Sequence, residues 1–182
     1  WAIASIAAMA ATPVAELDRD MVLAVLQATP LGTVLAVRAL ALPLAALAAF
    51  RRRIAPAALA ASVALGTTAW TGHAGASEAG LGTLHRAADV IHLLAAAAWR
   101  GALGRFRGAA ICGSDRRKQV RDLSAFAATG SVIVGLLLLT GIANTLIVAG
   151  WPPELASGWS LALGIKLALF ALMLALAAAN RW

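Results

Sequence analysis

Apolar residues run along this chain in long stretches, and the charged residues are gathered between them. A helix rises about 1.5 Å per residue, so ~20 apolar residues cross the ~30 Å hydrocarbon core of a bilayer. Stretches near that length lie at 31–50, 54–71, 89–106, 124–149 and 159–180. The pattern predicts an all-α protein, a polytopic transmembrane helix bundle with about five full spans.

We interpret both ends of the chain as truncated. Residues 1–12 are apolar but too short to span, and the chain opens on Trp1 without a basic segment of the kind a signal peptide has. We therefore interpret 1–12 as a partial first span. Residues 180–182 also stop abruptly. We expect residues 1–182 to form a single transmembrane helical domain that is a piece of a larger multi-span protein.

Composition supports the membrane prediction. Hydrophobic residues make up 62% of the chain and charged residues 13%, against about 25% charged in ordinary soluble domains. The net charge of +7 would also suit a nucleic-acid-binding protein. The basic residues flank spans, however, with no aromatic platform among them, and this argues against nucleic acid as a partner.

Basic residues predict the orientation in the membrane. Three lie at 51–53, six in the connection 105–123 and one at Arg181, whereas the alternate connections hold only Arg19 and Arg86. Loops rich in Lys and Arg stay on the cytoplasmic side. We expect 51–53 and 105–123 to be cytoplasmic and 72–88 to face outward.

Polar residues inside the predicted spans share one depth. Arg38, His92, Asn144 and Lys166 lie on four different spans, all toward the outer face, and the histidines His73 and His85 belong to the adjacent outer connection. Ionisable groups are expensive in hydrocarbon and usually have a role there. The shared depth predicts an outward-facing vestibule lined by these side chains.

Histidines at such a vestibule suggest metal chemistry. Asp89 and His92 are spaced i, i+3 and share a helix face. A carboxylate beside a histidine can set its tautomer, and imidazole ligands suit copper or zinc. We take His73 and His92 as candidate metal ligands and His85 as a third candidate. Asp89, Arg38, Lys166 and Asn144 are then supporting residues of the vestibule.

Each of these residues also has a plainer interpretation. His73 and His85 are equally typical of loop or surface histidines, and His92 of a histidine hydrogen-bonded to a neighbouring helix. Arg38 and Lys166 can extend toward the outer head groups or pair with Asp89. Asn144 is typical of a hydrogen bond between membrane helices. Both sets of interpretations stay open at this level.

Short motifs are spread over most of the chain. They are Thr29-Pro30-Leu31-Gly32 followed by Arg38, Thr71-Gly72-His73-Ala74, Asp89-Val90-Ile91-His92 running to Trp99 and Gly101, Phe126 opening a span, Thr140-Gly141-Ile142-Ala143-Asn144, and Lys166-Leu167-Ala168-Leu169-Phe170 leading to Asn180-Arg181. Together they resemble the CopD copper-resistance family of bacterial inner-membrane proteins. One position departs, because Arg100 stands where the family pattern has an apolar residue.

The resemblance implies an eight-span bundle of which this chain holds the later spans. It also implies movement of copper across the inner membrane beside a periplasmic copper-binding partner of the CopC type, with His73 and His92 as the copper contacts. On this interpretation the protein is a transporter and not an enzyme. Arg38 and Lys166 count against a cation path, because they raise the barrier to a positive ion.

Two other functions fit the same residues. An intramembrane histidine with Arg and Lys nearby could hold haem, with His92 as axial ligand and the cations on the propionates, and the region faintly resembles HemJ-type protoporphyrinogen oxidases. A passive structural subunit is the third interpretation. A visible spectrum of the purified protein distinguishes haem from copper.

Overall fold

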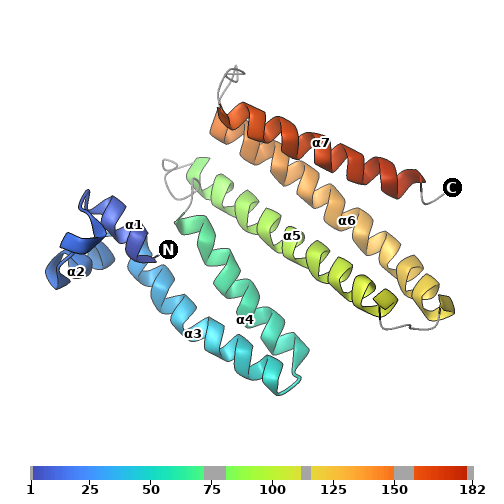
Figure 1. Ribbon diagram of the computed structural model, residues 1–182, viewed down its shortest axis with the longest axis horizontal. Coiled ribbons are helices and arrows are strands. Elements are labelled where there is room, and N and C mark those ends of the chain that lie inside the picture. The colour runs from blue at the N-terminus through green and yellow to red at the C-terminus, as the bar shows by residue number, and fades with distance from the viewer. Residues whose placement is uncertain (1, 72–80, 112–115, 150–157, 180–182) are drawn as a thin grey trace. The chain divides into compact units, whose positions relative to one another are not determined.

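The computed structural model describes residues 2–71, 81–111, 116–149 and 158–179 (Figure 1). Within these ranges all regular structure is helical, which confirms the all-α prediction. The chain divides into two compact units, residues 1–144 and 145–182. The helices are α1 (Ala2–Met9), α2 (Arg19–Ala28), α3 (Pro30–Phe50), α4 (Ile54–Gly66), α5 (Leu81–Ile111), α6 (Arg116–Ala149) and α7 (Gly158–Ala179), with short 3₁₀ helices η1 (Val14–Glu16) and η2 (Thr67–Trp70).

Local sequence signals explain where α2 and α3 begin. The Asp18 carboxylate accepts a hydrogen bond from the Met21 amide at 2.7 Å and caps α2. Thr29 caps α3, its hydroxyl accepting from the Leu31 amide at 3.3 Å, and Pro30 occupies the first helical position. Capping side chains satisfy amides that have no partner inside the helix, and proline there loses no hydrogen bond.

The α3–α4 hairpin is closed by the basic turn at 51–53. The Arg53 amide donates to the Ala48 carbonyl at 2.8 Å and the Arg52 amide to the Ala49 carbonyl at 2.9 Å. This is the Schellman pattern, which needs a left-handed residue just past the helix end. Arg52 occupies that position, with φ 55°. The turn therefore directs α4 back along α3, and the two helices pack antiparallel (Figure 1).

Helices α5 and α6 are longer than the spans predicted at 89–106 and 124–149. Helix α5 begins at Leu81, eight residues before the predicted span, so His85 lies on the helix and not in a loop before it. Helix α6 begins at Arg116, so most basic residues of the predicted loop 105–123 lie on helix ends. Helical backbone satisfies its own hydrogen bonds, and both helices therefore continue through polar sequence beyond the apolar stretch.

Two helices in the described ranges are long and apolar enough to cross a bilayer, Pro30–Phe50 and Arg121–Val148. The stretches Ile54–Trp70 and Ser160–Ala175 are apolar but shorter. Helix α5 carries charges along its length, including an exposed Arg100. Membrane-like helices are thus present, while the expected number of five spans plus a partial first one remains a prediction.

The apolar residues of this fold are mostly on its outside. Small residues such as Ala41, Ala69 and Ala95 are buried between helices, whereas Leu40 is 70% exposed and Leu139 is 67% exposed. Soluble proteins rarely expose contiguous apolar surfaces of that kind. Small residues at helix contacts and large ones outside are the arrangement that lipid-facing helices adopt.

Charge is separated between the two ends of the first unit. Because α3 runs antiparallel to α4 and α5 antiparallel to α6, the turn at 51–53, the last turns of α5 and the first turns of α6 lie at one end (Figure 1). That end carries Arg51, Arg53 and the Arg105–Asp122 ion pair at 3.4 Å. The opposite end holds η2, the start of α5 and the last turns of α6 within this unit.

The close contact between α3 and α2 at Gly32 can be tested by substitution. A Cβ at Gly32 would clash with the Leu26 carbonyl oxygen, so α3 approaches α2 too closely for any side chain. We expect Gly32→Ala to destabilise the protein by about 1–3 kcal/mol, the usual range for overpacking. Thermal unfolding of the detergent-solubilised protein, followed by circular dichroism, measures this.

The matched control is Gly101→Ala. Gly101 is also helical, but a Cβ there meets no atom within 4 Å. Removing glycine from an open helix position stabilises it by roughly 0.5–1 kcal/mol. The two substitutions should therefore shift the unfolding temperature in opposite directions, and equal shifts would contradict the close approach at Gly32.

Candidate functional site

Two polar contacts join α5 to α6 at the end of the unit opposite the basic turn. The Asn144 side-chain amide donates to an Asp89 carboxylate oxygen at 3.4 Å, and His92 Nδ1 lies 2.9 Å from the Thr140 hydroxyl oxygen. Asp89 and His92 are one turn apart on α5, as are Thr140 and Asn144 on α6. We call these two contacts the polar rungs. The Asp89–Asn144 contact is the upper rung and the His92–Thr140 contact is the lower rung.

The lower rung determines which imidazole nitrogen carries the proton. The Thr140 hydroxyl donates to the Leu136 carbonyl of the preceding turn, so its single proton is already used. Its oxygen must therefore accept from His92, which requires the proton on Nδ1 of the neutral ring. Nε2 then carries the lone pair, and a neutral imidazole binds a metal through its lone-pair nitrogen.

His92 also lies against the backbone of α6. A Cβ added at Gly141 would sit 3.6 Å from the ring carbon Cε1 and 3.9 Å from Nδ1. A side chain of that size would be in ordinary van der Waals contact with the ring, so the imidazole edge lies beside this turn of α6. Ring position and ring tautomer are thus both determined by the same turn of α6.

The upper rung leaves a buried acceptor. In the described part of the chain the Asn144 Oδ1 atom is buried and has no hydrogen-bond partner. A buried polar atom without a partner costs about 1–3 kcal/mol. Beside it lies the Asp89 carboxylate, so the rung presents two oxygen acceptors. Such a pair attracts a cation or a hydrogen-bond donor and adds negative charge one turn from His92.

His85 lies deep in the packing, with 3% of its surface exposed. It occupies the same helix as His92, seven residues earlier, and so lies ~10 Å away along the axis. Side chains meet on a helix at spacings of three or four residues. The two histidines therefore mark two levels of α5, one at its first turns and one at the lower rung.

Arg38 connects α3 to the end of α4. Its Nε donates to the Thr67 hydroxyl at 2.9 Å, and that hydroxyl donates to the Ala64 carbonyl at 2.7 Å. The arginine is partly buried, as a charged residue inside a bundle is expected to be. The Thr67 hydroxyl thus accepts a hydrogen bond from Arg38 on a neighbouring helix. The Thr140 hydroxyl accepts one from His92 in the same way.

Not every predicted site residue is placed beside the rungs. Lys166 lies on α7 in the second unit, with an exposed side chain. His73 lies outside the described residues. Among the residues that are described, no three His, Cys, Asp or Glu side chains converge on one point. The ligand set His73, His92 and His85 therefore remains a prediction.

Sequence reasoning placed Asp89 as the partner that sets the His92 tautomer, and missed the threonines. Nδ1 of His92 pairs with Thr140, while Asp89 pairs with Asn144. A signal was present, because Thr140 and Asn144 are four residues apart and so share a helix face. The interhelical hydrogen bonds considered as plainer interpretations of His92 and Asn144 are both present.

Comparison with known proteins points to one family. Residues 1–83 match the family model described as "Copper resistance protein D-like, N-terminal domain", and residues 120–182 match "Copper resistance protein D". The chain is 36% identical to copper resistance protein D of Pseudomonas syringae pv. tomato over 171 residues. The chain belongs to the CopD copper-resistance family. This confirms the resemblance seen in the short motifs.

The CopD relatives are longer than this chain. The alignment with the Pseudomonas protein covers 85% of the chain and 54% of that relative. The inner membrane protein YebZ of Escherichia coli is 34% identical over 116 residues, covering 63% of the chain and 40% of that relative. The chain thus spans about half the length of the curated relatives it matches. No solved structure matches it.

The residues of the rungs lie partly inside a matched region and partly between the two matched regions. Thr140 and Asn144 lie within 120–182, and Arg38 and Thr67 lie within 1–83. His85, Asp89 and His92 lie between the two matched regions. The α6 side of each rung thus belongs to a CopD family domain, and the α5 side belongs to the segment that connects the two domains.

The tautomer argument predicts a spectroscopic result. The chain has three histidines, so nitrogen NMR of ¹⁵N-histidine-labelled full-length protein can be assigned with a His92→Gln variant. At a pH where His92 is neutral, we expect its proton on Nδ1. Thr140→Val keeps the side-chain shape but removes the acceptor, and should shift the proton toward Nε2, the form that dominates without such a partner.

Two controls accompany this measurement. Thr140→Ser retains the hydroxyl and should retain the Nδ1–H form. Thr68→Val removes a threonine whose hydroxyl donates to Leu65 within its own helix, and should leave His92 unchanged. A proton found on Nε2 in the unmodified protein would rule out the argument from Thr140.

Proposed function

We propose that this CopD-family chain handles copper at the membrane, moving it across the bacterial inner membrane from an outward-facing vestibule that contains His92. The observation that carries the proposal is the lower rung, in which Thr140 holds the imidazole with its lone pair on Nε2. Family membership supports copper as the cargo. Imidazole is a suitable ligand for copper in either oxidation state.

The spacing of the histidines suits passage better than tight retention. His85 and His92 lie ~10 Å apart along α5, too far for an i, i+4 chelate. An ion bound by few ligands at each level leaves more readily than one held by a closed set of four. We propose that His73, His85 and His92 act at successive levels, with His73 at the outer mouth.

The upper rung, which contains Asp89, has an electrostatic role in this scheme. Asp89 lies one turn from His92, and its charge attracts a cation into the vestibule. Arg38 opposes that attraction, but its Nε is bonded to Thr67 on the α3–α4 side. We propose that Lys166, whose side chain is exposed, receives an anionic surface of a periplasmic copper-binding partner of the CopC type, while Asp89 and Asn144 face the ion.

Orientation follows from the charge separation in the first unit. The end with Arg51, Arg53 and Arg105 is the basic end, and the rungs lie at the other. Basic ends of membrane helices remain cytoplasmic. We propose that the rungs are near the periplasmic face, where copper delivered by a soluble partner first meets the protein.

Cysteine labelling tests the orientation. In a Cys112→Ser background, a cysteine at Ser114 should react with a membrane-impermeant maleimide only after the inner membrane is opened. A cysteine at Ser77 should react in intact spheroplasts. Both positions lie outside the described residues and belong to the predicted loops. Labelling at Ser114 from the periplasmic side would overturn the orientation.

Copper binding tests the site. His92→Ala and His73→Ala should each sharply lower the copper retained by the purified full-length protein and the copper accumulated by cells. Thr140→Val and Asp89→Asn should lose less, about 10–100-fold in affinity, as substitutions behind a metal ligand do. His85→Ala should lose less than His92→Ala, because His85 is only one of the successive levels.

The control for this experiment is Thr68→Val, which should bind and accumulate copper like the parent. Metal analysis and a visible spectrum are recorded on the same samples. Unchanged copper binding by His92→Ala would place the metal site elsewhere. A Soret band that disappears in His92→Ala would favour a haem protein over a copper transporter.

A further inference from the structure

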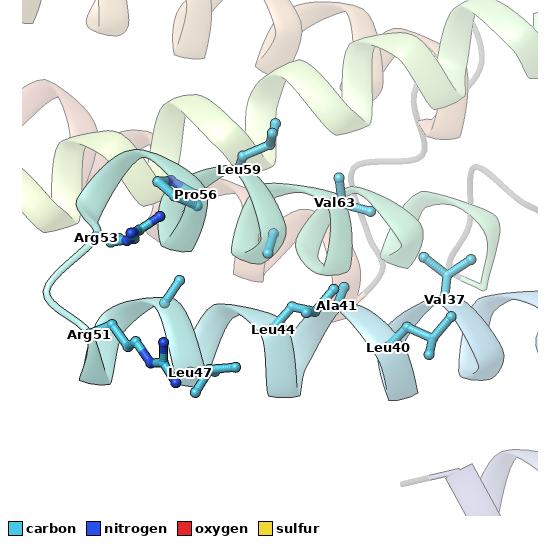
Figure 2. A pocket seen from close by; sticks show the side chains of 12 residues that line it. Val37, Leu40, Ala41, Leu44, Leu47, Arg51, Arg53, Pro56, Leu59 and Val63 are labelled. Carbon is cyan, nitrogen blue, oxygen red and sulfur yellow. The ribbon is translucent and has the colours of Figure 1, made fainter.

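A groove of about 700 Å³ runs between α3 and α4 (Figure 2). Its length follows α3 from Val37 to Arg51, about 14 residues or ~21 Å of helix. The basic turn closes one end. In Figure 2 the side chains of Arg51 and Arg53 lie at that end, and aliphatic side chains line the rest.

The groove has a small-residue floor and leucine walls. Ala41 is 6% exposed and lies between the helices, whereas Leu44 and Leu47 on α3 are 59% and 51% exposed. On α4, Leu59 is 69% exposed. The alanines let the backbones approach, and the longer side chains on either side leave an apolar channel between them. An apolar channel of this shape accommodates a flexible hydrocarbon chain.

The charged end of the groove lacks a counter-charge. In the described ranges neither Arg51 nor Arg53 has a carboxylate within ion-pair distance, and the ion pair found at this end joins Arg105 to Asp122. The turn geometry explains their position. Arg52 takes the left-handed position of the Schellman turn, and the arginines on either side of it both line the groove.

We propose that this groove binds an anionic phospholipid, with its phosphate between Arg51 and Arg53 and one acyl chain along the α3–α4 channel. Helix α3 is long and apolar enough to cross a bilayer, so the basic turn lies at the level of the head groups. One leaflet of hydrocarbon is ~15 Å thick. The apolar length of the groove is therefore enough for one acyl chain.

Charge complementarity selects the anionic lipid. Two guanidinium groups at the head-group level attract a net negative head group, and arginine matches phosphate oxygens in bidentate geometry. A zwitterionic head group would bring its own cation beside the two arginines. A packed protein helix would have to supply carboxylates at the same point. A lipid phosphate satisfies both the apolar channel and the charge at its end.

Native mass spectrometry of the full-length protein in detergent tests the proposal. Phosphatidylglycerol and phosphatidylcholine are added at equal concentrations, and the retained lipid is counted at increasing collision energy. The unmodified protein should retain phosphatidylglycerol selectively. Each surface arginine contributes about a 5-fold factor in anionic-lipid affinity. Arg51→Gln or Arg53→Gln should therefore lose about 5-fold, and the double variant about 30-fold.

Two matched controls separate a built site from general attraction to a basic surface. Arg52→Gln removes the same charge from the same turn but does not line the groove, and should lose less of the retained lipid than Arg51→Gln or Arg53→Gln. Ala60→Phe fills the channel from α4, whereas Ala61→Phe places the same ring on a neighbouring position outside it. Only Ala60→Phe should release phosphatidylglycerol, and circular dichroism should report the same helix content for both.

Other occupants give different results. Equal lipid loss in Arg52→Gln and Arg51→Gln would mean non-specific attraction and overturn the proposal. Inorganic phosphate that displaces phosphatidylglycerol at millimolar concentration would reduce the site to an anion site without an acyl channel. A dimer that Ala60→Phe dissociates, with lipid retention unchanged, would assign the groove to a second copy of the chain. None of these outcomes bears on copper binding by His92.

Discussion

Every polar group that this chain places among apolar helices needs a partner, because hydrocarbon offers none. A polar group moved into an apolar medium without a hydrogen bond costs several kcal/mol, which is comparable to the total stability of many domains. Threonines provide much of the pairing. Thr140 and Thr67 each donate to a carbonyl of their own helix and accept from a polar side chain on another. The helices are thereby joined at points that apolar packing alone would not specify.

The same pairing gives the candidate site its chemistry. A threonine with its proton already donated can only accept, so it selects one tautomer of the histidine opposite. The requirement for pairing inside the bundle and the requirement for a ligand nitrogen are met by one hydrogen bond. The Asp89–Asn144 rung one turn away adds oxygen acceptors, one of them a buried Asn144 atom without a partner in the described residues.

The two ends of the first unit differ in how their charges are used. At the rung end, Arg38, His92 and Asn144 each make a hydrogen bond to a side chain of a neighbouring helix. At the basic end, Arg51 and Arg53 face a groove that protein atoms of the described chain do not fill. This division matches the distribution of basic residues that orients membrane proteins. It also separates the proposed copper path, on α5 and α6, from the proposed lipid site, between α3 and α4.

The sequence by itself determined the helical class, the apolar stretches and the family, and it predicted one shared depth for Arg38, His92, Asn144 and Lys166. These follow from residue type and helical rise, which are local properties. Only the tertiary structure decided that Thr140 pairs with His92, that Asn144 pairs with Asp89 and that His85 is buried on a helix beginning at Leu81. Partner choice depends on which helix faces lie opposite each other, and that is set by packing between segments 29 to 55 residues apart. The pattern along a single helix contains the spacing of its polar residues but not the register of its neighbour.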